Sequence, residues 1–514
     1  METMDRRDFL RFGGRGLGYA ALARALAGCG GGGGNGGDSP PDEPPVTDTL
    51  PAASAESQWL KRTSFGVTPE SLSDIQSLGI EAYFEQQLNP GLLDDLAVET
   101  QVALRFPLAN AGPTALRAGY PDNQTTIVQH IEAATYFRAY FSPRQLYEVM
   151  VEFWHTHFSI QILNGVAPIF HPSYDADVIR PNALGRFGEL LLAVARSPAM
   201  VYYLDNFLNF VDSPQENYAR ELMELHTLGV DGGYTEQDVK EVARCFTGWT
   251  INSNTARFQF VAALHDDGPK TVLGHAIAAG GGISDGEQVL EILAAHPSTA
   301  QFIARKLCRR FVADQPPPGL VDDIAAVYVS TDGDISAMLR ALFAASDFSE
   351  LRDAKFLRPT EFLGQMLRAM NAPNDFPSGD RWSIYFYLLQ LLGQVPFYWV
   401  LPNGYPDVAA YWATTSGLLN RWRIALVPGI PDFQDLFDLS RLSAEAGTIA
   451  ELVDAVAANL LFRPLADEDR QGLIDYLSAQ AGVDADISLG AEALRALTAV
   501  SAALLVSSAY FQLR

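Results

Sequence analysis

The chain has 514 residues, of which 48% are hydrophobic and 19% charged, so it contains enough apolar side chains to fold rather than stay disordered. Its 36 Lys and Arg against 61 Asp and Glu give a formal net charge of −25, which argues against binding to nucleic-acid phosphates or anionic lipid. Beyond the N-terminal segment there is no run of about 18 uncharged apolar residues, so a lipid anchor is the only membrane contact we expect.

The first residues match an export signal. Arg6 and Arg7 are followed, after one residue, by a Phe-Leu pair, as in signals read by the twin-arginine export machinery. A weakly apolar stretch follows over residues 12–27, and two arginines make it too short and too charged to span a bilayer. We therefore expect residues 1–29 to be a signal peptide and the twin-arginine machinery to be a partner of the precursor.

The same stretch ends in Leu-Ala-Gly-Cys, which is similar to the sequence that lipoprotein signal peptidase recognises. Cys29 is then the lipidation site, and two or more acyl chains would hold the mature protein stably at the cell envelope, on its periplasmic or outer surface. Residues 30–55 are rich first in glycine and then in proline, which predicts a flexible tether. The other two cysteines, Cys245 and Cys308, could pair in an oxidising compartment or remain buried thiols.

From residue 56 onward, apolar side chains recur mainly at helical spacing, with helix start signals such as Thr235. We predict a mainly α fold, a large multi-helix globular body over residues 56–514, with a soft seam at 314–320. Residues 256–261 and 270–273 flank a turn-rich stretch and predict one small β-hairpin.

A first cluster of polar residues that could carry chemistry lies between residues 148 and 157. At about 100° per residue, Glu148, Glu152 and His155 share one narrow helical face, and His157 lies on another. Glu152 and His155 have the Glu-x-x-His spacing of di-iron carboxylate bundles, which need a second such pair. The sequence has no second pair, so a complete di-iron site is disfavoured.

A second cluster comprises Asn217, Arg220, Glu221, Glu224 and His226. Helical geometry brings the Asn and the two Glu side chains together. Four-residue spacing sets Arg220 beside both Glu216 and Glu224. His226 turns inward if the helix ends near Gly229, a residue suited to a C-cap.

Together the two clusters offer the imidazoles and carboxylates that bind zinc, iron or manganese. The predicted metal ligands are Glu152, His155, His157, Glu221, Glu224 and His226. His265 and Asp266 could join the same polar centre. In the alternative, His157 is a core histidine and the Glu and Arg residues, Arg220 among them, form ion pairs between packed helices. The sequence lacks a nucleophile elbow, a phosphate-binding loop and a dinucleotide fingerprint.

At these motifs the chain resembles the exported bacterial family known as domain of unknown function 1800. The matching segments occur in order across roughly residues 56–425 and are Phe153–Phe158, Ser197–Asp205, Glu216–Gly229, Tyr234–Trp249, His265-Asp266 and Lys270–Gly274. The chain departs at Asn403-Gly-Tyr-Pro406, where the family pattern has Gly-Trp-Pro. The resemblance implies a twin-arginine signal and frequent neighbourhood with exported, sulfatase-like proteins, but no established activity.

These observations predict an exported, lipid-anchored cell-envelope protein whose buried His/Glu polar centre holds a transition metal. If it is an enzyme, a redox or metal-assisted hydrolytic reaction would suit that location. The alternative is a non-catalytic assembly or secretion partner of another exported protein, in which the ionic centre only organises the fold. A large exposed apolar patch away from the histidines would favour the partner role.

Overall fold

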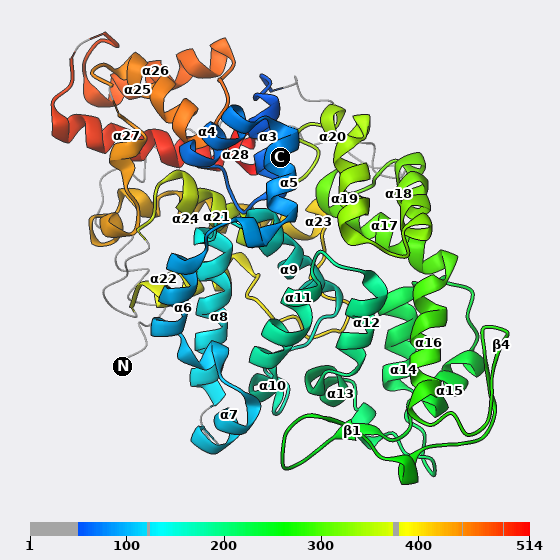
Figure 1. Ribbon diagram of the computed structural model, residues 1–514. Coiled ribbons are helices and arrows are strands. Elements are labelled where there is room, and N and C mark those ends of the chain that lie inside the picture. Colours follow the sequence, from blue (N-terminus) through cyan, green and yellow to red (C-terminus); the bar gives the residue numbers. More distant parts are fainter. Residues whose placement is uncertain (1–49, 121–123, 374–379, 445, 487) are drawn as a thin grey trace, which may run out of the picture. The chain divides into compact units, whose positions relative to one another are not determined.

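The computed structural model of the protein describes residues 50–514, apart from 121–123, 374–379, 445 and 487 (Figure 1). The predicted export signal at Arg6 and Arg7, the lipidation site Cys29 and nearly all of the tether lie outside the described residues. Residues 50–514 form one unit. Within it, the proline-rich turn near residues 314–320 joins two helices that pack on each other, α17 (Pro297–Phe311) and α18 (Pro318–Ser330).

Helices make up most of the described chain, which confirms the mainly α fold. The first are α3 (Ala55–Thr63), α4 (Pro69–Leu78), α5 (Ile80–Leu88), α6 (Leu96–Arg105), α7 (Pro113–Gly119), α8 (Gln124–Phe141), α9 (Gln145–His157), α10 (Ala167–Ser173) and α11 (Arg180–Asn182). Then come α12 (Phe187–Ala195), α13 (Pro198–Tyr203), α14 (Asn217–Glu221), α15 (Glu236–Cys245), α16 (Ile283–Ala295), α17 (Pro297–Phe311), α18 (Pro318–Ser330), α19 (Ile335–Ala344) and α20 (Ser346–Glu350). The last are α21 (Pro359–Ala369), α22 (Asp380–Leu392), α23 (Ala409–Trp412), α24 (Thr415–Ala425), α25 (Ile449–Val456), α26 (Asp467–Ala481), α27 (Ala491–Ser507) and α28 (Ala509–Gln512).

Threonine caps begin several of these helices. Thr235 starts α15 as the sequence predicts: its hydroxyl accepts from the Asp238 N–H, and the Asp238 carboxylate accepts from the Thr235 N–H. Thr68 and Thr448 form the same reciprocal box at α4 and α25. Each box satisfies backbone N–H groups that would otherwise lack partners in the first helical turn.

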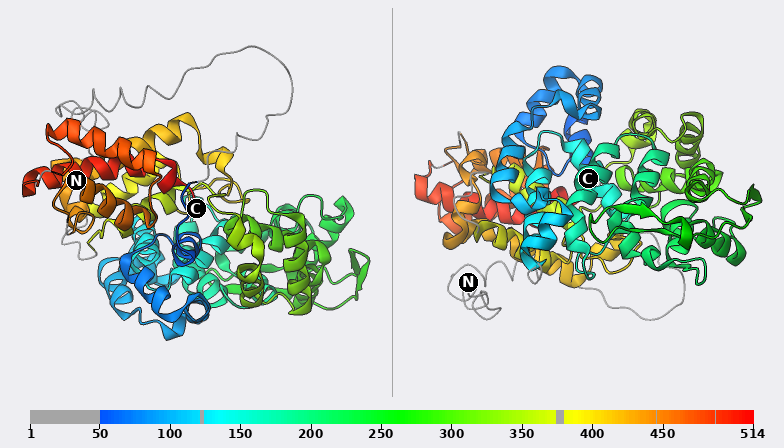
Figure 2. Two further views of the ribbon diagram at one scale, coloured as in Figure 1. Left: turned by 90° about the horizontal axis from the view of Figure 1, so that it is seen from above. Right: turned by 60° about the horizontal axis from the view of Figure 1, so that its bottom comes forward.

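Helix α9 is held in the main hydrophobic core. Leu146, Val149 and Met150 are fully buried, and α9 contacts α3, α5 and α8. The buried Trp154 indole N–H donates to the Ala183 carbonyl at 2.9 Å. The C-terminal helices, orange to red, lie on one side of the central helices α8–α10, and the green helices α16–α19 on the other (Figures 1 and 2).

The strands form two small antiparallel hairpins rather than the predicted one. β1 (Trp249–Ile251) pairs with β2 (Phe258–Phe260), and β3 (Lys270–Val272) pairs with β4 (His275–Ile277). The predicted pairing of 256–261 with 270–273 is therefore wrong, because each segment has a nearer partner. Leu273 and Gly274 both have positive φ, at 49° and 79°, as the tight two-residue turn between β3 and β4 requires.

Cys245 and Cys308 are both free and buried, so no disulfide joins them. Burial raises the pKa of each thiol to about 12, as expected for inert core cysteines. Among the described residues, no helix is both long enough and apolar enough to cross a membrane.

Candidate functional site

Helix α9 presents its polar residues on two faces, as the sequence predicts. Glu148, Glu152 and His155 line one cavity of about 50 Å³, here called the central cavity. His157 points elsewhere, toward Lys306 and His226. The remaining residues that line the central cavity are Phe65, Thr135, Tyr136, Ala139, Val151, Thr156, Ser159, Arg180, Thr360, Gln394, Pro396, Phe397, Trp399 and Tyr405.

His155 is oriented by a carboxylate that the sequence did not single out. Pro172 lies inside α10, and the helix then widens into a π-helix over Tyr174–Ile179. This turn brings Asp175 Oδ1 to 2.8 Å from His155 Nε2. Burial would raise the pKa of Asp175, but Arg180, the hydrogen bond with His155, and Arg138 hold it well below its ordinary value. Asp175 is therefore an anion that fixes the His155 ring.

Arg180 joins this pair to α9. Its guanidinium donates to both Glu148 carboxylate oxygens, at 2.9 and 3.1 Å, and to Asp175 at 2.7 Å. Burial would lower the pKa of Arg180, but Asp175 and Glu148 raise it well above its ordinary value. Arg138 lies 3.8 Å from Asp175 and binds both oxygens of Glu99, at 2.8 and 2.9 Å. Three carboxylates thus face two guanidinium groups, which leaves one negative charge beside His155.

Glu152 belongs to a second ionic network. Its two carboxylate oxygens accept from Arg358 at 3.0 and 2.8 Å, although the residues are 206 positions apart in sequence. Arg358 also binds Glu361, which contacts Arg310 and Arg514 as well. Burial would raise the pKa of Glu361, but these arginines hold it well below its ordinary value. Glu152 therefore forms an ion pair, as the alternative interpretation predicts, but its partner is Arg358 and not Arg220.

A second histidine stacks on His155. The His171 ring lies 5.4 Å from the His155 ring at an interplanar angle of 9°, and burial lowers the pKa of His171 to about 3. Neither ring nitrogen of His171 has a partner among the described residues. The Phe397 ring packs on both histidine rings, with its centroid 4.1 Å from that of His171 and 5.0 Å from that of His155. The backbone of Phe397 has a φ of +64°. A phenylalanine rarely adopts this conformation, and such strain is frequent at functional sites.

His157 behaves as a core histidine. Its Nε2–H donates to the His226 carbonyl at 3.0 Å, and its Nδ1 accepts from Lys306 Nζ at 2.8 Å. Burial, Lys306 and His226 lower the pKa of His157 well below its ordinary value. His226 itself is buried with no partner for either ring nitrogen in the described chain, and burial lowers its pKa to about 3. It turns inward because the helix ends before Gly229, whose φ is +83°.

The rest of the second cluster faces other partners. Arg220 binds Glu216 at 3.2 Å, as predicted, but its second carboxylate is Glu236, at 2.7 and 2.8 Å, and not Glu224. Glu224 accepts from the Tyr234 hydroxyl at 3.2 Å. Burial and then the nearby Glu224 raise the pKa of Glu221. The Asn217 amide donates to the Leu204 carbonyl at 3.3 Å.

His265 and Asp266 belong to a further polar group. His265 Nδ1 donates to the Thr247 carbonyl at 2.8 Å, and its Nε2 lies 3.2 Å from Asp285, which also binds Lys270 at 2.5 Å. Asp266 pairs with Arg244 at 2.7 and 3.1 Å.

The six predicted metal ligands therefore lie in three different surroundings. Glu152 and His155 line the central cavity. His157 lies against His226, and Glu221 lies near Glu224. Across residues 50–514, in their described portion, no three His, Cys, Asp or Glu side chains are grouped so that they could hold a metal ion.

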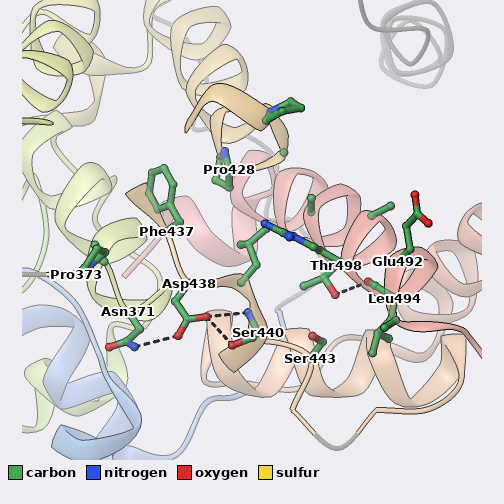
Figure 3. A pocket seen from close by; sticks show the side chains of 18 of the residues that line it. Asn371, Pro373, Pro428, Phe437, Asp438, Ser440, Ser443, Glu492, Leu494 and Thr498 are labelled. Atoms are coloured by element: carbon green, nitrogen blue, oxygen red, sulfur yellow. Dashed lines mark hydrogen bonds between the residues drawn. The ribbon is translucent and has the colours of Figure 1, made fainter. Parts of the chain in front are cut away.

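A larger groove of about 1250 Å³ lies between α27 and the segments around Asn371 and Asp438 (Figure 3). None of the predicted site residues lines it. The Asp438 carboxylate accepts from the Asn371 amide at 3.3 Å and from the Ser440 hydroxyl at 2.6 Å. No histidine of the described chain lines this groove, whereas the central cavity has His155 paired with a carboxylate, so the central cavity is the better candidate for acid–base chemistry.

Comparison with known proteins gives a family and no function. Neither the curated proteins nor the solved structures contain a match to the chain. A family model described as "Protein of unknown function (DUF1800)" matches residues 58–513, nearly the whole described chain. The protein therefore belongs to the DUF1800 family.

Proposed function

We propose that this protein is exported by the twin-arginine machinery, anchored to the cell envelope by lipid on Cys29, and uses the central cavity as an acid–base site. His155 is the group that takes up and releases the proton, and the substrate is a small compound of the envelope or its surroundings. The observation that carries the proposal is the 2.8 Å pair of His155 and Asp175 at the wall of a cavity.

The pair defines which nitrogen does the chemistry. Asp175 is an anion, so it accepts the N–H of His155 Nε2. In the neutral ring the lone pair is then on Nδ1, which can act as a general base. A proton taken up at Nδ1 would place a positive charge on the ring, beside a network with one uncompensated negative charge. The network consists of three carboxylates and two guanidinium groups: Glu99, Glu148, Asp175, Arg138 and Arg180. The network therefore supports a positively charged intermediate state of the ring.

The size of the central cavity limits what it holds in this state. About 50 Å³ accommodates one or two water molecules, each of which takes about 30 Å³ in the liquid. A substrate would enter when the aromatic wall opens, and Phe397 and Trp399 form that wall on a loop. The strained backbone of Phe397 supports this role for the loop.

Metal-assisted chemistry has weaker support. Glu148 and Glu152 each bind a guanidinium through both oxygens. A metal ion would have to displace Arg180 or Arg358 to use these carboxylates, and both pairs are largely shielded from solvent.

A second candidate function is that of a non-catalytic partner of another exported protein, such as a co-encoded sulfatase-like protein. The same bidentate ion pairs favour it, because carboxylates paired in this way can serve to lock α8, α9 and α21 together.

Turnover distinguishes the two functions. The purified protein is incubated with a small-molecule extract of the cell envelope, and compounds consumed or formed are measured by mass spectrometry. The His155→Asn variant should lose every conversion that the wild type makes. His275→Asn, which changes an exposed histidine, is the matched control and should keep them. Identical profiles for the wild type and His155→Asn would refute the acid–base proposal and favour the partner function.

A further inference from the structure

A second, larger cavity lies beside the central one and takes no part in the proposed function. Its volume is about 250 Å³, and we call it the outer cavity. Tyr398 lines the outer cavity, whereas its neighbours Phe397 and Trp399 line the central one. The other residues that line the outer cavity, drawn from α8, α10, α22 and the loop before α10, are Gln124, Thr125, Val128, Gln129, Glu132, Leu163, Gly165, Pro168 and Phe386.

Glu132 is the one ionisable carboxyl in this lining. Only 3% of the residue is exposed, and its Oε1 atom is buried without a hydrogen-bond partner among the described residues. Burial raises the pKa of Glu132 to about 8, and a hydrogen bond from the Tyr398 side chain offsets part of that rise. No Lys or Arg of the described chain contributes to this pKa, in contrast to the guanidinium partners of Glu148 and Glu152. A buried carboxyl with no cationic partner and one unpartnered oxygen is costly to the fold, so it calls for a functional explanation.

Aromatic rings stand beside this carboxyl. Phe386 and Tyr398 contact each other edge to face, with centroids 6.2 Å apart and an interplanar angle of 65°, and both line the outer cavity. The faces of such rings attract cations, and aromatic rings with a carboxylate are the usual recognition elements for ammonium groups. Gln124 and Gln129 add amide groups that can hydrogen-bond to the remainder of a ligand.

We propose that the outer cavity binds a small organic cation with an ammonium group, with Glu132 as its counter-ion and Phe386 and Tyr398 as its aromatic contacts. The volume lies just below the range of about 300–1,000 Å³ typical of drug-sized ligands, so the ligand is a small amine or quaternary ammonium compound. The net charge of −25 favours the approach of cations over anions.

Choline is the first probe, because its quaternary ammonium group carries a permanent charge and cannot itself gain or lose a proton. Its binding to the full-length protein is measured by calorimetry at pH 7 in two buffers with different ionisation enthalpies. Glu132 is mostly protonated at that pH and must ionise to pair with the cation. We expect close to one proton to be released for each choline bound.

The variants distinguish a site that recognises the charge of the ligand from a cavity that only accommodates apolar groups. Glu132→Gln keeps the shape of the protonated side chain, so the protein should fold, while choline affinity should fall at least about tenfold and proton release should vanish. Glu189→Gln, on the exposed side of α12, is the control and should change neither quantity. The neutral isostere 3,3-dimethylbutan-1-ol should bind at least about tenfold more weakly than choline.

Butylamine, a primary amine, is the second probe. Three results would overturn the proposal: no binding of either choline or butylamine up to about 10 mM, equal affinity for choline and its neutral isostere, or unchanged choline binding in Glu132→Gln.

Discussion

Replacing Arg180 by methionine removes the cation that joins Asp175 to α9. The side chains of Arg180 and Glu148 are 13% and 4% exposed, so the variant leaves a buried carboxylate without its bidentate partner. Asp175 keeps His155 at 2.8 Å and Arg138 at 3.8 Å, so most of the loss falls on Glu148. Removing one member of a buried pair costs about 3–5 kcal/mol, and we expect the free energy of unfolding at pH 7 to fall by that amount.

The loss should depend on pH in a defined direction. An ionised carboxylate left without a partner in the interior is costly, whereas a neutral carboxylic acid is much less so. The destabilisation should therefore be larger at pH 7 than in acid. Glu148→Gln in the Arg180→Met background should restore part of the stability at pH 7.

Urea unfolding, followed by circular dichroism at pH 4.5 and pH 7, measures both effects. Arg186→Met is the control, because Arg186 and Asp332 form an exposed pair, 46% and 87% accessible, whose loss should cost less than about 1 kcal/mol. If Arg180→Met is no more destabilised at pH 7 than Arg186→Met, the reasoning about the buried network is wrong.

Three further predictions follow from other parts of the chain. Changing Arg6 and Arg7 to lysine should leave precursor in the cytoplasm, and normal arrival at the envelope, seen by fractionation and immunoblotting, would contradict twin-arginine export. Cys29→Ser should abolish labelling with an acyl probe and leave uncleaved precursor, whereas wild-type protein that is unlabelled and cut elsewhere would contradict lipidation. Because Glu132 has a folded-state pKa of about 8, above its unfolded value, Glu132→Gln should raise the free energy of unfolding at pH 7 by on the order of 3 kcal/mol and leave it unchanged at pH 4. An equal effect at the two pH values would show that the carboxyl is not desolvated.

The parts of the site that lie on a single helix could be predicted from the sequence. Helical periodicity separates Glu148, Glu152 and His155 from His157, and the structure has the same division. The inward turn of His226 also follows from a local signal, the glycine at the end of its helix.

The partners of these residues could not be predicted, because they come from distant parts of the chain. Arg358 reaches Glu152 across 206 residues, and no spacing in the sequence reports such a contact. Asp175 lies in a π-helix, where the 3.6-residue period that places side chains on faces no longer holds. Strand pairing failed for a related reason: the pattern indicates strands, while the turn between residues 272 and 275 decides which of them pair.

The acid–base site depends most directly on the orientation of the His155 ring. Nitrogen-15 NMR of protein labelled at histidine, assigned with the His155→Asn variant, reports which ring nitrogen carries the proton in the neutral form. We expect the proton on Nε2, bound to Asp175, and a free lone pair on Nδ1; Asp175→Leu should abolish this preference. A neutral His155 protonated on Nδ1 in the wild type, or a tautomer unchanged in Asp175→Leu, would contradict the acid–base site.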